Sequence, residues 1–289
     1  MSLIDARGLR KHYRGMRAGD VCALDGFDLT LEPGRILGLI GPNGSGKTTA
    51  LKAFLGLTHL DGGDMRVLGL DPRRQRKALM TRTGYIADVG TLPRWMRVHQ
   101  LLDYVAGVHP GFRRERAQAA LSHTDVRPDS RIQGLSRGMT VQLHLALVLA
   151  VQADLLVLDE PTLGLDILYR QQFYDRLLSE FDGERQGILI TTHEVREIEH
   201  LLTDVVFIHH GRAVLQAPMD DLAARFLRLG VGPGEAAAAR ALGPISERHS
   251  LNGIEMVFDG RARSELEPLG PVATPTLPEL FVALLGENR

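Results

Sequence analysis

A glycine-rich run, Gly41 to Thr49, ends in one lysine and two threonines, and it follows an apolar stretch, Ile36 to Ile40, that is typical of a buried strand. The run fits G-x-x-x-x-G-K-[ST], a spacing in which glycines let the backbone bend so that successive N–H groups face phosphate oxygens. A helix that begins near Lys47 would add the positive end of its dipole. The run therefore predicts a phosphate-binding loop, in which Lys47 contacts the β- and γ-phosphates and Thr48 offers its hydroxyl to Mg²⁺.

Two carboxylates follow a second apolar strand. The segment Leu155 to Leu158 delivers Asp159 and Glu160 to the carboxyl end of the predicted sheet, where ligands lie in open α/β proteins. Asp159 would hold Mg²⁺ through its water shell, and Glu160 would orient or deprotonate the water that attacks the γ-phosphate. The alternative is that Asp-Glu-Pro only starts a turn.

A histidine, His193, ends a third apolar strand, Gly187 to Thr192. A lone histidine at a strand end usually makes a structural hydrogen bond. Because this one falls at the same edge of the sheet as the two carboxylates, we expect it to contact the γ-phosphate.

Composition limits the partners of the chain. Its 289 residues include 34 basic and 35 acidic ones, and the formal charge of −1 gives no global reason to bind nucleic acid or an anionic membrane. The single cysteine excludes an internal disulfide and fits a reducing compartment. The start does not resemble a signal sequence and no apolar segment is long enough to cross a bilayer, so we expect a soluble chain.

The apolar pattern also predicts the elements that must position these motifs. Short strands are expected in the first forty residues, a helix at about 48–57 and another strand at 65–70. Helical spacing from 98 to 151 indicates a helical insertion. From about 218, scattered glycine and proline and the alternating segment 253–258 indicate a small appendage without a catalytic constellation.

The segment Leu135-Ser-Arg-Gly-Met139 lies shortly before the acidic strand and resembles the signature segment of ATP-binding cassette (ABC) proteins. The resemblance covers about residues 3–217 and keeps the family's motifs in the family's order. These are the Walker A loop at 41–49, the signature, the Walker B carboxylates, a D-loop at 162–166 and a switch histidine. Within the family, the chain is similar to the ATP-binding subunits of exporter-type (drug- or antibiotic-like) transporters.

The resemblance implies ATP and Mg²⁺ as ligands and assigns contacts to them. Tyr13 would stack on adenine, although an aromatic at this position could equally pack in the first sheet. Ser136 and Gly138 would contact a γ-phosphate held by an opposite module, although Ser136 could also be a helix N-cap. The implied nucleotide contacts are Tyr13, Gly41, Asn43, Gly44, Ser45, Gly46, Lys47, Thr48, Thr49, Ser136, Gly138 and Asp166, the metal ligands are Thr48, Asp159 and Asp88, and the catalytic residues are Glu160, His193 and Lys47.

One position departs from the family's pattern. The family usually places glutamine after the Gly-Tyr strand, where this chain has Asp88 after Ala87. Glutamine offers a neutral oxygen and an amide donor, whereas Asp88 brings a negative charge. Asp88 either binds the metal or lies beyond its reach and only shapes the loop.

The implied fold is α/β: a P-loop NTPase core of ABC type with an antiparallel β subdomain and a helical subdomain, plus a small C-terminal α+β appendage. We expect the nucleotide-binding domain at 1–217, its helical subdomain at about 89–152 and the appendage at 218–289. Two such modules would pair head to tail with ATP in the interface, as a homodimer or with a similar chain.

The implied function is ATP hydrolysis that powers a separate integral membrane permease. The chain would lie in the cytoplasm, on the inner face of the membrane through that permease, and no nucleic acid is expected as a partner.

The closing segment 276–285 is similar to the last helix of exporter-type subunits, although an amphipathic packing helix explains it too. Trp95 and Met96 predict a permease-contact surface, with ordinary core as the alternative. Two other functions remain open, a soluble ABC ATPase that acts on ribosomes or DNA and a non-hydrolysing regulatory subunit.

Overall fold

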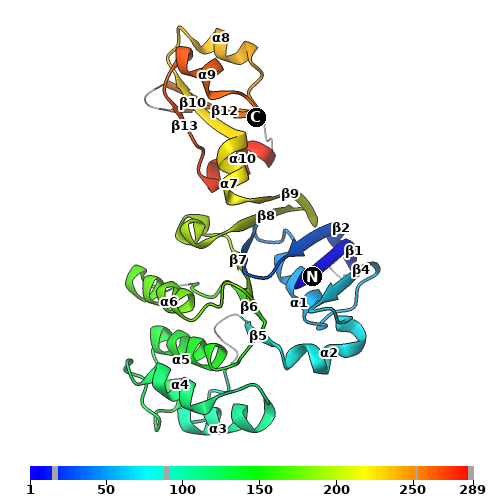
Figure 1. Ribbon diagram of the computed structural model, residues 1–289, viewed down its shortest axis with the longest axis vertical. Helices are drawn as coiled ribbons and strands as arrows, with labels where there is room; N and C mark the ends of the chain where they lie inside the picture. Colours follow the sequence, from blue (N-terminus) through cyan, green and yellow to red (C-terminus); the bar gives the residue numbers. More distant parts are fainter. Residues whose placement is uncertain (15–18, 88–91, 164, 251–252, 286–289) are drawn as a thin grey trace.

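The computed structural model describes residues 1–14, 19–87, 92–163, 165–250 and 253–285. Asp88 lies outside the described residues, so its predicted role stays a prediction. The described residues form three sheets, of three, six and four strands. Figure 1 shows the four-stranded sheet at one end of the long axis and a helical layer at the other. No helix among the described residues is long and apolar enough to span a membrane.

The six-stranded sheet carries the phosphate-loop motifs. Its spatial order is β5-β6-β7-β3-β8-β9, with all neighbours parallel except the last pair. The strands are β3 (Ile36–Ile40), β5 (Thr83–Ile86), β6 (Leu155–Asp159), β7 (Gly187–Thr192), β8 (Asp204–His209) and β9 (Arg212–Pro218). Strands β3, β6 and β7 are buried throughout, as expected for apolar runs in a parallel sheet covered on both faces. Because these three strands are neighbours, their carboxyl ends bring the predicted motifs to one edge.

An antiparallel sheet and α1 cover one face of this central sheet. The antiparallel strands pair in the order β2-β1-β4, and their apolar side chains share a core with α1 and with alternate residues of β3, β6 and β7. The elements are β1 (Ile4–Tyr13), β2 (Val21–Leu31), α1 (Lys47–Phe54), β4 (Gly62–Val67) and α2 (Pro72–Met80). Strand β4 starts three residues before the predicted 65–70, because Gly62 to Asp64 pair with β1 despite their turn-like composition.

Helices form the opposite end of the cassette. A separate apolar cluster holds them together, and Figure 1 shows them stacked below the central sheet. They are α3 (Val98–Val108), α4 (Arg114–Leu121), the short η1 (Ile132–Gly134) and α5 (Arg137–Leu149). Helix α6 (Ile167–Ser179) lies next to the sheet, and its buried residues belong to the core of that sheet instead. All but α6 fall within the helical stretch that the sequence predicts.

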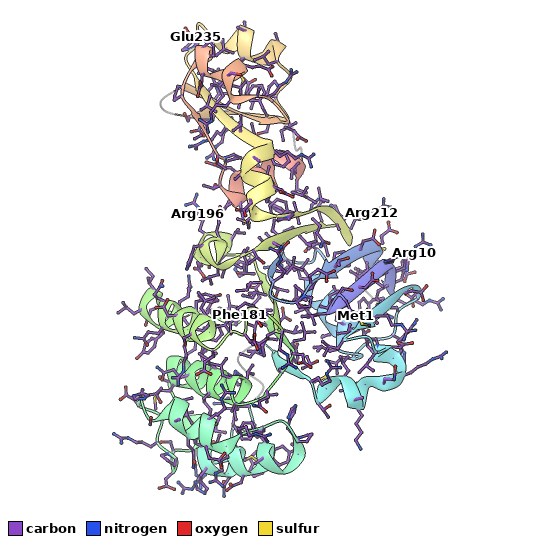
Figure 2. The ribbon with its side chains drawn as sticks, viewed as in Figure 1. Met1, Arg10, Phe181, Arg196, Arg212 and Glu235 are labelled. Atoms are coloured by element: carbon purple, nitrogen blue, oxygen red, sulfur yellow. The ribbon has the colours of Figure 1, made fainter. Side chains whose placement is uncertain are left out.

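The residues after β9 form the appendage. Its sheet has the order β11-β12-β10-β13 and its own apolar cluster. The elements are α7 (Met219–Arg225), β10 (Phe226–Val231), α8 (Ala236–Ala241), β11 (Ser246–Ser250), β12 (Gly253–Asp259), α9 (Arg263–Leu266), η4 (Glu267–Leu269), β13 (Val272–Ala273) and α10 (Leu277–Leu285). In Figure 2, Glu235 marks the far end of this unit and Arg196 the side of the cassette that faces it.

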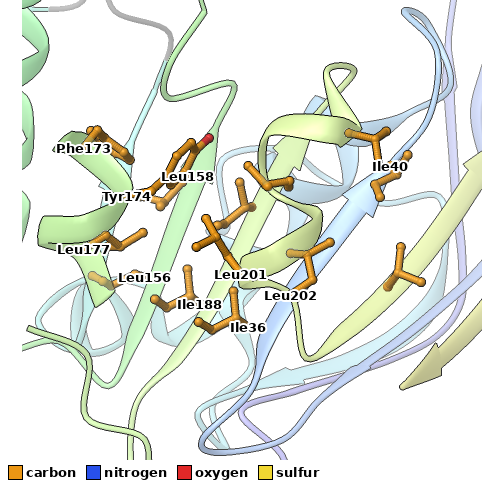
Figure 3. Packing of buried hydrophobic residues seen from close by; sticks show 14 of the residues in the cluster. Ile36, Ile40, Leu156, Leu158, Phe173, Tyr174, Leu177, Ile188, Leu201 and Leu202 are labelled. Atoms are coloured by element: carbon orange, nitrogen blue, oxygen red, sulfur yellow. The ribbon is translucent and has the colours of Figure 1, made fainter. Parts of the chain in front are cut away.

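The second core of the cassette also takes in part of the appendage. It packs β3, β6, β7 and α6 against two short helices, η2 (Val195–Glu197) and η3 (Glu199–Leu201), as Figure 3 shows. Leu277 and Leu280 of α10 belong to the same buried cluster. The predicted boundary at 217/218 falls at the end of β9, and packing crosses it through α10.

Candidate nucleotide-binding site

The turn from β3 into α1 is built on glycines that no other residue can replace. A Cβ on Gly41 would lie 2.3 Å from the Ile208 carbonyl oxygen, and one on Gly46 would lie 2.3 Å from that of Ala23. Gly46 also has φ 112°, in the left-handed region, and it precedes α1 without a side-chain capping bond. The first N–H groups of α1 are therefore not capped by a side chain of their own helix, which is the arrangement of an anion site.

Lys47 lies buried within this loop, with 6% of its surface exposed. Its Nζ donates to the carbonyl oxygens of Gly41 at 2.6 Å and Pro42 at 3.2 Å, and it lies 3.9 Å from Glu160 Oε1. Burial lowers the pKa of Lys47, while the negative charges of Glu160 and Asp159 oppose that change. A cationic donor is thus held over the bend of the loop and beside the acidic pair.

Asp159 joins the two motifs. Its buried Oδ1 accepts from the hydroxyl of Thr191 at 2.7 Å and, more weakly, from that of Thr48 at 3.5 Å. Sequence reasoning missed Thr191. The signal was two threonines closing a strand that is otherwise apolar and wholly buried, because a buried hydroxyl requires a partner.

Glu160 leaves the end of β6 in a rare backbone conformation. Its φ is 48°, and its N–H donates to the Thr191 carbonyl oxygen at 3.2 Å. This turn directs the carboxylate to His193, whose Nδ1 lies 3.0 Å from Glu160 Oε2. An ionised carboxylate only accepts hydrogen bonds, so it favours the histidine tautomer with the proton on Nδ1. The strand ends thus bring together Lys47, Asp159, Glu160 and His193.

The donor set fits a magnesium nucleotide. Ser45 Oγ lies inside the phosphate loop, where it is buried and has no hydrogen-bond partner among the described residues. The oxygens of Thr48 and Asp159 are of the type that Mg²⁺ prefers, and this ion usually takes one or two protein ligands and keeps several waters. No group of three or more His, Cys, Asp or Glu side chains that could hold a metal ion occurs within the described ranges.

The signature residues lie elsewhere, on the helical side. Ser136 caps α5, and its exposed Oγ accepts from the Met139 N–H at 3.2 Å. A Cβ on Gly138 would lie 3.3 Å from the Tyr169 ring, and Asp166 caps α6 by accepting from the Tyr169 N–H at 3.0 Å. Between the described residues, no hydrogen bond or ion pair connects these side chains to the loop 41–49. The structure therefore brings four of the predicted residues together at the sheet edge and leaves three others on a separate surface. The first group is Lys47, Asp159, Glu160 and His193, and the second is Ser136, Gly138 and Asp166.

The remaining predicted residues lie at the surface or in the loop. Tyr13 ends β1 and is 41% exposed, with Lys11 Nζ 5.1 Å from its ring centroid, so it is not part of the first sheet's core. Asn43 and Gly44 are exposed at the tip of the loop, and Thr49 is half-buried in α1.

The predicted permease contacts divide between surface and core. Trp95 is 71% exposed, so the ordinary-core alternative is wrong for this residue. Met96 is partly buried and packs against the helical cluster. Of the two residues, only Trp95 presents most of its side chain to solvent.

A phosphate loop and an acidic pair that meet at the carboxyl edge of a parallel sheet define a nucleotide-binding protein of the phosphate-loop class. Residues 24–163 match the family model described as ABC transporter. The chain is 33% identical over 261 residues to Nod factor export ATP-binding protein I of Burkholderia thailandensis, with 86% of this chain and 83% of the relative covered. It is also 31% identical over 313 aligned positions to the daunorubicin resistance ATP-binding protein DrrA3 of Streptomyces coeruleorubidus, covering 99% of this chain and 96% of the relative. The chain belongs to the ABC transporter family.

Solved structures agree with this assignment at the level of the fold. An ATP-binding subunit of an ABC transporter superposes with a TM-score of 0.68 at 24% identity, over 77% of this chain and 92% of that one. The cassette MJ0796, in a dimeric post-hydrolysis state with ADP and inorganic phosphate, superposes with a TM-score of 0.66 at 17% identity, over 75% of this chain and 98% of that one. The predicted ABC-type α/β fold is confirmed.

Proposed function

We propose that this chain is the ATP-hydrolysing subunit of an ABC exporter and that it drives a separate membrane permease. The observation that carries the proposal is the cluster of Lys47, Asp159, Glu160 and His193 at one sheet edge, beside an uncapped helix start. The relatives are named for Nod factor export and for daunorubicin resistance, which supports export over an action on ribosomes or DNA.

Each residue of the cluster has a chemical task in this proposal. Lys47 and the N–H groups of the loop would bind the β- and γ-phosphates, and Thr48 and Asp159 would hold Mg²⁺. When bound, that ion neutralises phosphate charge. Glu160 positions the attacking water and accepts its proton, and His193 holds the Glu160 carboxylate in place through its Nδ1.

The signature surface would complete the site from a second chain. Ser136 and Gly138 begin α5, whose positive dipole end is exposed and lies away from the phosphate loop of the same chain. Pairing two chains head to tail would place each α5 start against the nucleotide of its partner. Such a dimer explains why one chain carries two phosphate-binding features that it does not join itself.

A membrane permease, encoded as a separate chain, would be a further partner. We propose that the exposed Trp95 contacts it and that the chain is thereby held at the cytoplasmic face of the membrane. Adenine stacking on Tyr13 and a metal contact from Asp88 belong to the same proposal.

A purified-protein ATPase assay tests the proposal. We expect Mg²⁺-dependent release of phosphate from ATP that is lost in Lys47→Ala, with an Lys52→Ala control in the same helix unchanged. Full binding of ATP with no phosphate release by the native chain would instead support the non-hydrolysing regulatory function.

A further inference from the structure

The last helix of the appendage, α10, packs against the segment that follows the switch histidine. We call residues 193–202 the switch segment; it contains η2 and η3 and leads from β7 to β8. Leu277 and Leu280 of α10 lie in the same buried cluster as Val195 and Ile198 of this segment. The appendage thus contacts the segment within two residues of His193.

A directed hydrogen bond and a ring contact fix this packing. The backbone N–H of Leu277, at the start of α10, donates to Oε1 of Glu199 at 3.0 Å. Further along the helix, Phe281 meets Phe207 of β8 edge to face, with ring centroids 5.1 Å apart. The hydrogen bond therefore fixes the start of α10 on the switch segment, and the ring contact fixes the helix on the neighbouring strand β8.

The same helix also borders the catalytic edge of the sheet. A hollow of about 430 Å³ lies between the loop and α10, and it is lined by Gly41 and Pro42 on one side, by His193 in the middle and by Phe281 and Val282 on the other. Within the described part of the appendage, the residues that line this hollow all belong to α10. A shift of α10 would consequently change the surroundings of His193.

The switch segment is held from two further directions. At its start, β7 is fixed in the central sheet, and from α6 the guanidinium of Arg170 forms an ion pair with Glu197. On the appendage side, Arg228 of β10 donates to Glu279 of α10 at 2.9 Å. The appendage sheet is thereby coupled through α10 to the segment that carries the histidine.

From this packing we infer that α10 is a positioning element for the hydrolytic reaction, with Glu199 and Phe281 as positioning residues that act through His193. The inference rests on the proposed ATPase function. Its physical basis is that His193 directly follows β7. Among the described residues, its ring nitrogens approach the carboxylates of Glu160 and Glu194, so the orientation of the ring depends on the packing of the segment behind it.

The test is a double-mutant cycle on the purified full-length chain, with kcat and KM for ATP measured separately. Glu199→Ala removes the acceptor at the start of α10, and we expect kcat to fall about tenfold at unchanged KM, because a misplacement of about 1 Å at a catalytic group can cost as much as about 10²-fold. Glu199→Gln keeps an acceptor oxygen and should restore kcat. In a His193→Ala background, Glu199→Ala should have no further effect, since the histidine through which it acts is gone.

A matched control lies in the appendage itself. Glu265 accepts the backbone N–H of Ala262 at 3.2 Å at the start of α9, the same kind of bond far from the switch segment, and Glu265→Ala should leave kcat unchanged. Phe281→Leu is a second substitution in α10, and it keeps most of the apolar volume of the side chain. It should lower kcat in the same way, again only when His193 is present.

The outcomes separate the inference from the proposed function. Native hydrolysis that Glu199→Ala and Phe281→Leu leave intact would overturn the inference and leave the ATPase in place. A fall in kcat that persists unchanged in the His193→Ala background would also overturn it, because the effect would then be general destabilisation. Absence of hydrolysis in the native chain would reject the proposed function instead.

Discussion

The phosphate-loop edge and the signature surface differ in how their polar groups are satisfied. At the loop, Lys47 and Asp159 are buried and each is paired inside the chain. At the signature, Ser136 is exposed and its hydroxyl only caps its own helix. The loop half is therefore preorganised within a single chain. The exposed signature half is what our proposal expects of a surface that a partner chain completes.

The largest effect is expected at Glu160, in the preorganised half. Glu160→Gln removes the proton acceptor but keeps the side-chain shape, so kcat should fall about 10²- to 10³-fold while ATP affinity is retained. Phosphate release and nucleotide binding measured on the same preparation check this. Glu184→Gln, an exposed carboxylate outside the site, should change neither quantity.

A substitution in the signature should distinguish the contribution of the loop half of the site from that of the signature half. Gly138→Asp adds a negative charge at the start of α5 and a Cβ that meets the Tyr169 ring at 3.3 Å, so hydrolysis should fall about 10²-fold while a single chain still binds ATP. Gly134→Asp, where a Cβ has open space, is the matched control. Loss of ATP binding by monomeric Gly138→Asp would contradict the division into two halves.

A third comparison concerns stability and involves a histidine buried in the helical layer. His144 is 7% exposed, its Nδ1 has no hydrogen-bond partner among the described residues, and burial lowers its pKa to about 4. Below the ordinary value of about 6.5 the unfolded chain binds the proton and the folded chain does not. Stability should therefore fall as pH drops from about 6.5 to about 4, by up to about 3 kcal/mol from this group.

Denaturant unfolding at a series of pH values checks this expectation. His144→Leu should flatten the acid limb of the stability curve, whereas His249→Leu, with a side chain that is 79% exposed, should not. Equal slopes in the native chain and in His144→Leu would show that the histidine is not the source.

The smallest effect on the isolated chain is expected at Trp95. Because its side chain is exposed, Trp95→Ala should change the free energy of unfolding by less than about 0.5 kcal/mol and leave the ATPase intact. Co-purification with the permease from detergent-solubilised membranes should nevertheless be lost. Val214→Ala, an exposed apolar residue on β9, should retain the permease.

The sequence allowed much of the catalytic edge to be predicted. The strands Ile36–Ile40 and Gly187–Thr192 are found with the predicted bounds, because long apolar runs in a parallel sheet leave little choice of register. Because the two strands are parallel neighbours, their carboxyl ends lie at the same edge of the sheet. The two threonines that close β7 signal that a buried hydroxyl needs a partner, but the identity of that partner, Asp159 on the neighbouring strand, is set by the sheet and not by the local sequence.

The joint between appendage and cassette could not be predicted. The helical character of the last segment was evident from its apolar spacing, but its packing against Val195 and Ile198 joins residues some eighty positions apart. The hydrogen bond between Glu199 and Leu277 likewise depends on the tertiary structure. From the sequence alone, a glutamate on a helical turn is predicted to be exposed to solvent.

The most direct test of the central claim, that two chains share each nucleotide, is sedimentation of Glu160→Gln with and without Mg·ATP. The account predicts a monomer without nucleotide and a dimer holding two ATP with it, and it predicts that Gly138→Asp in the same background stays monomeric. A Glu160→Gln chain that binds one ATP and remains a monomer at every concentration would contradict the account.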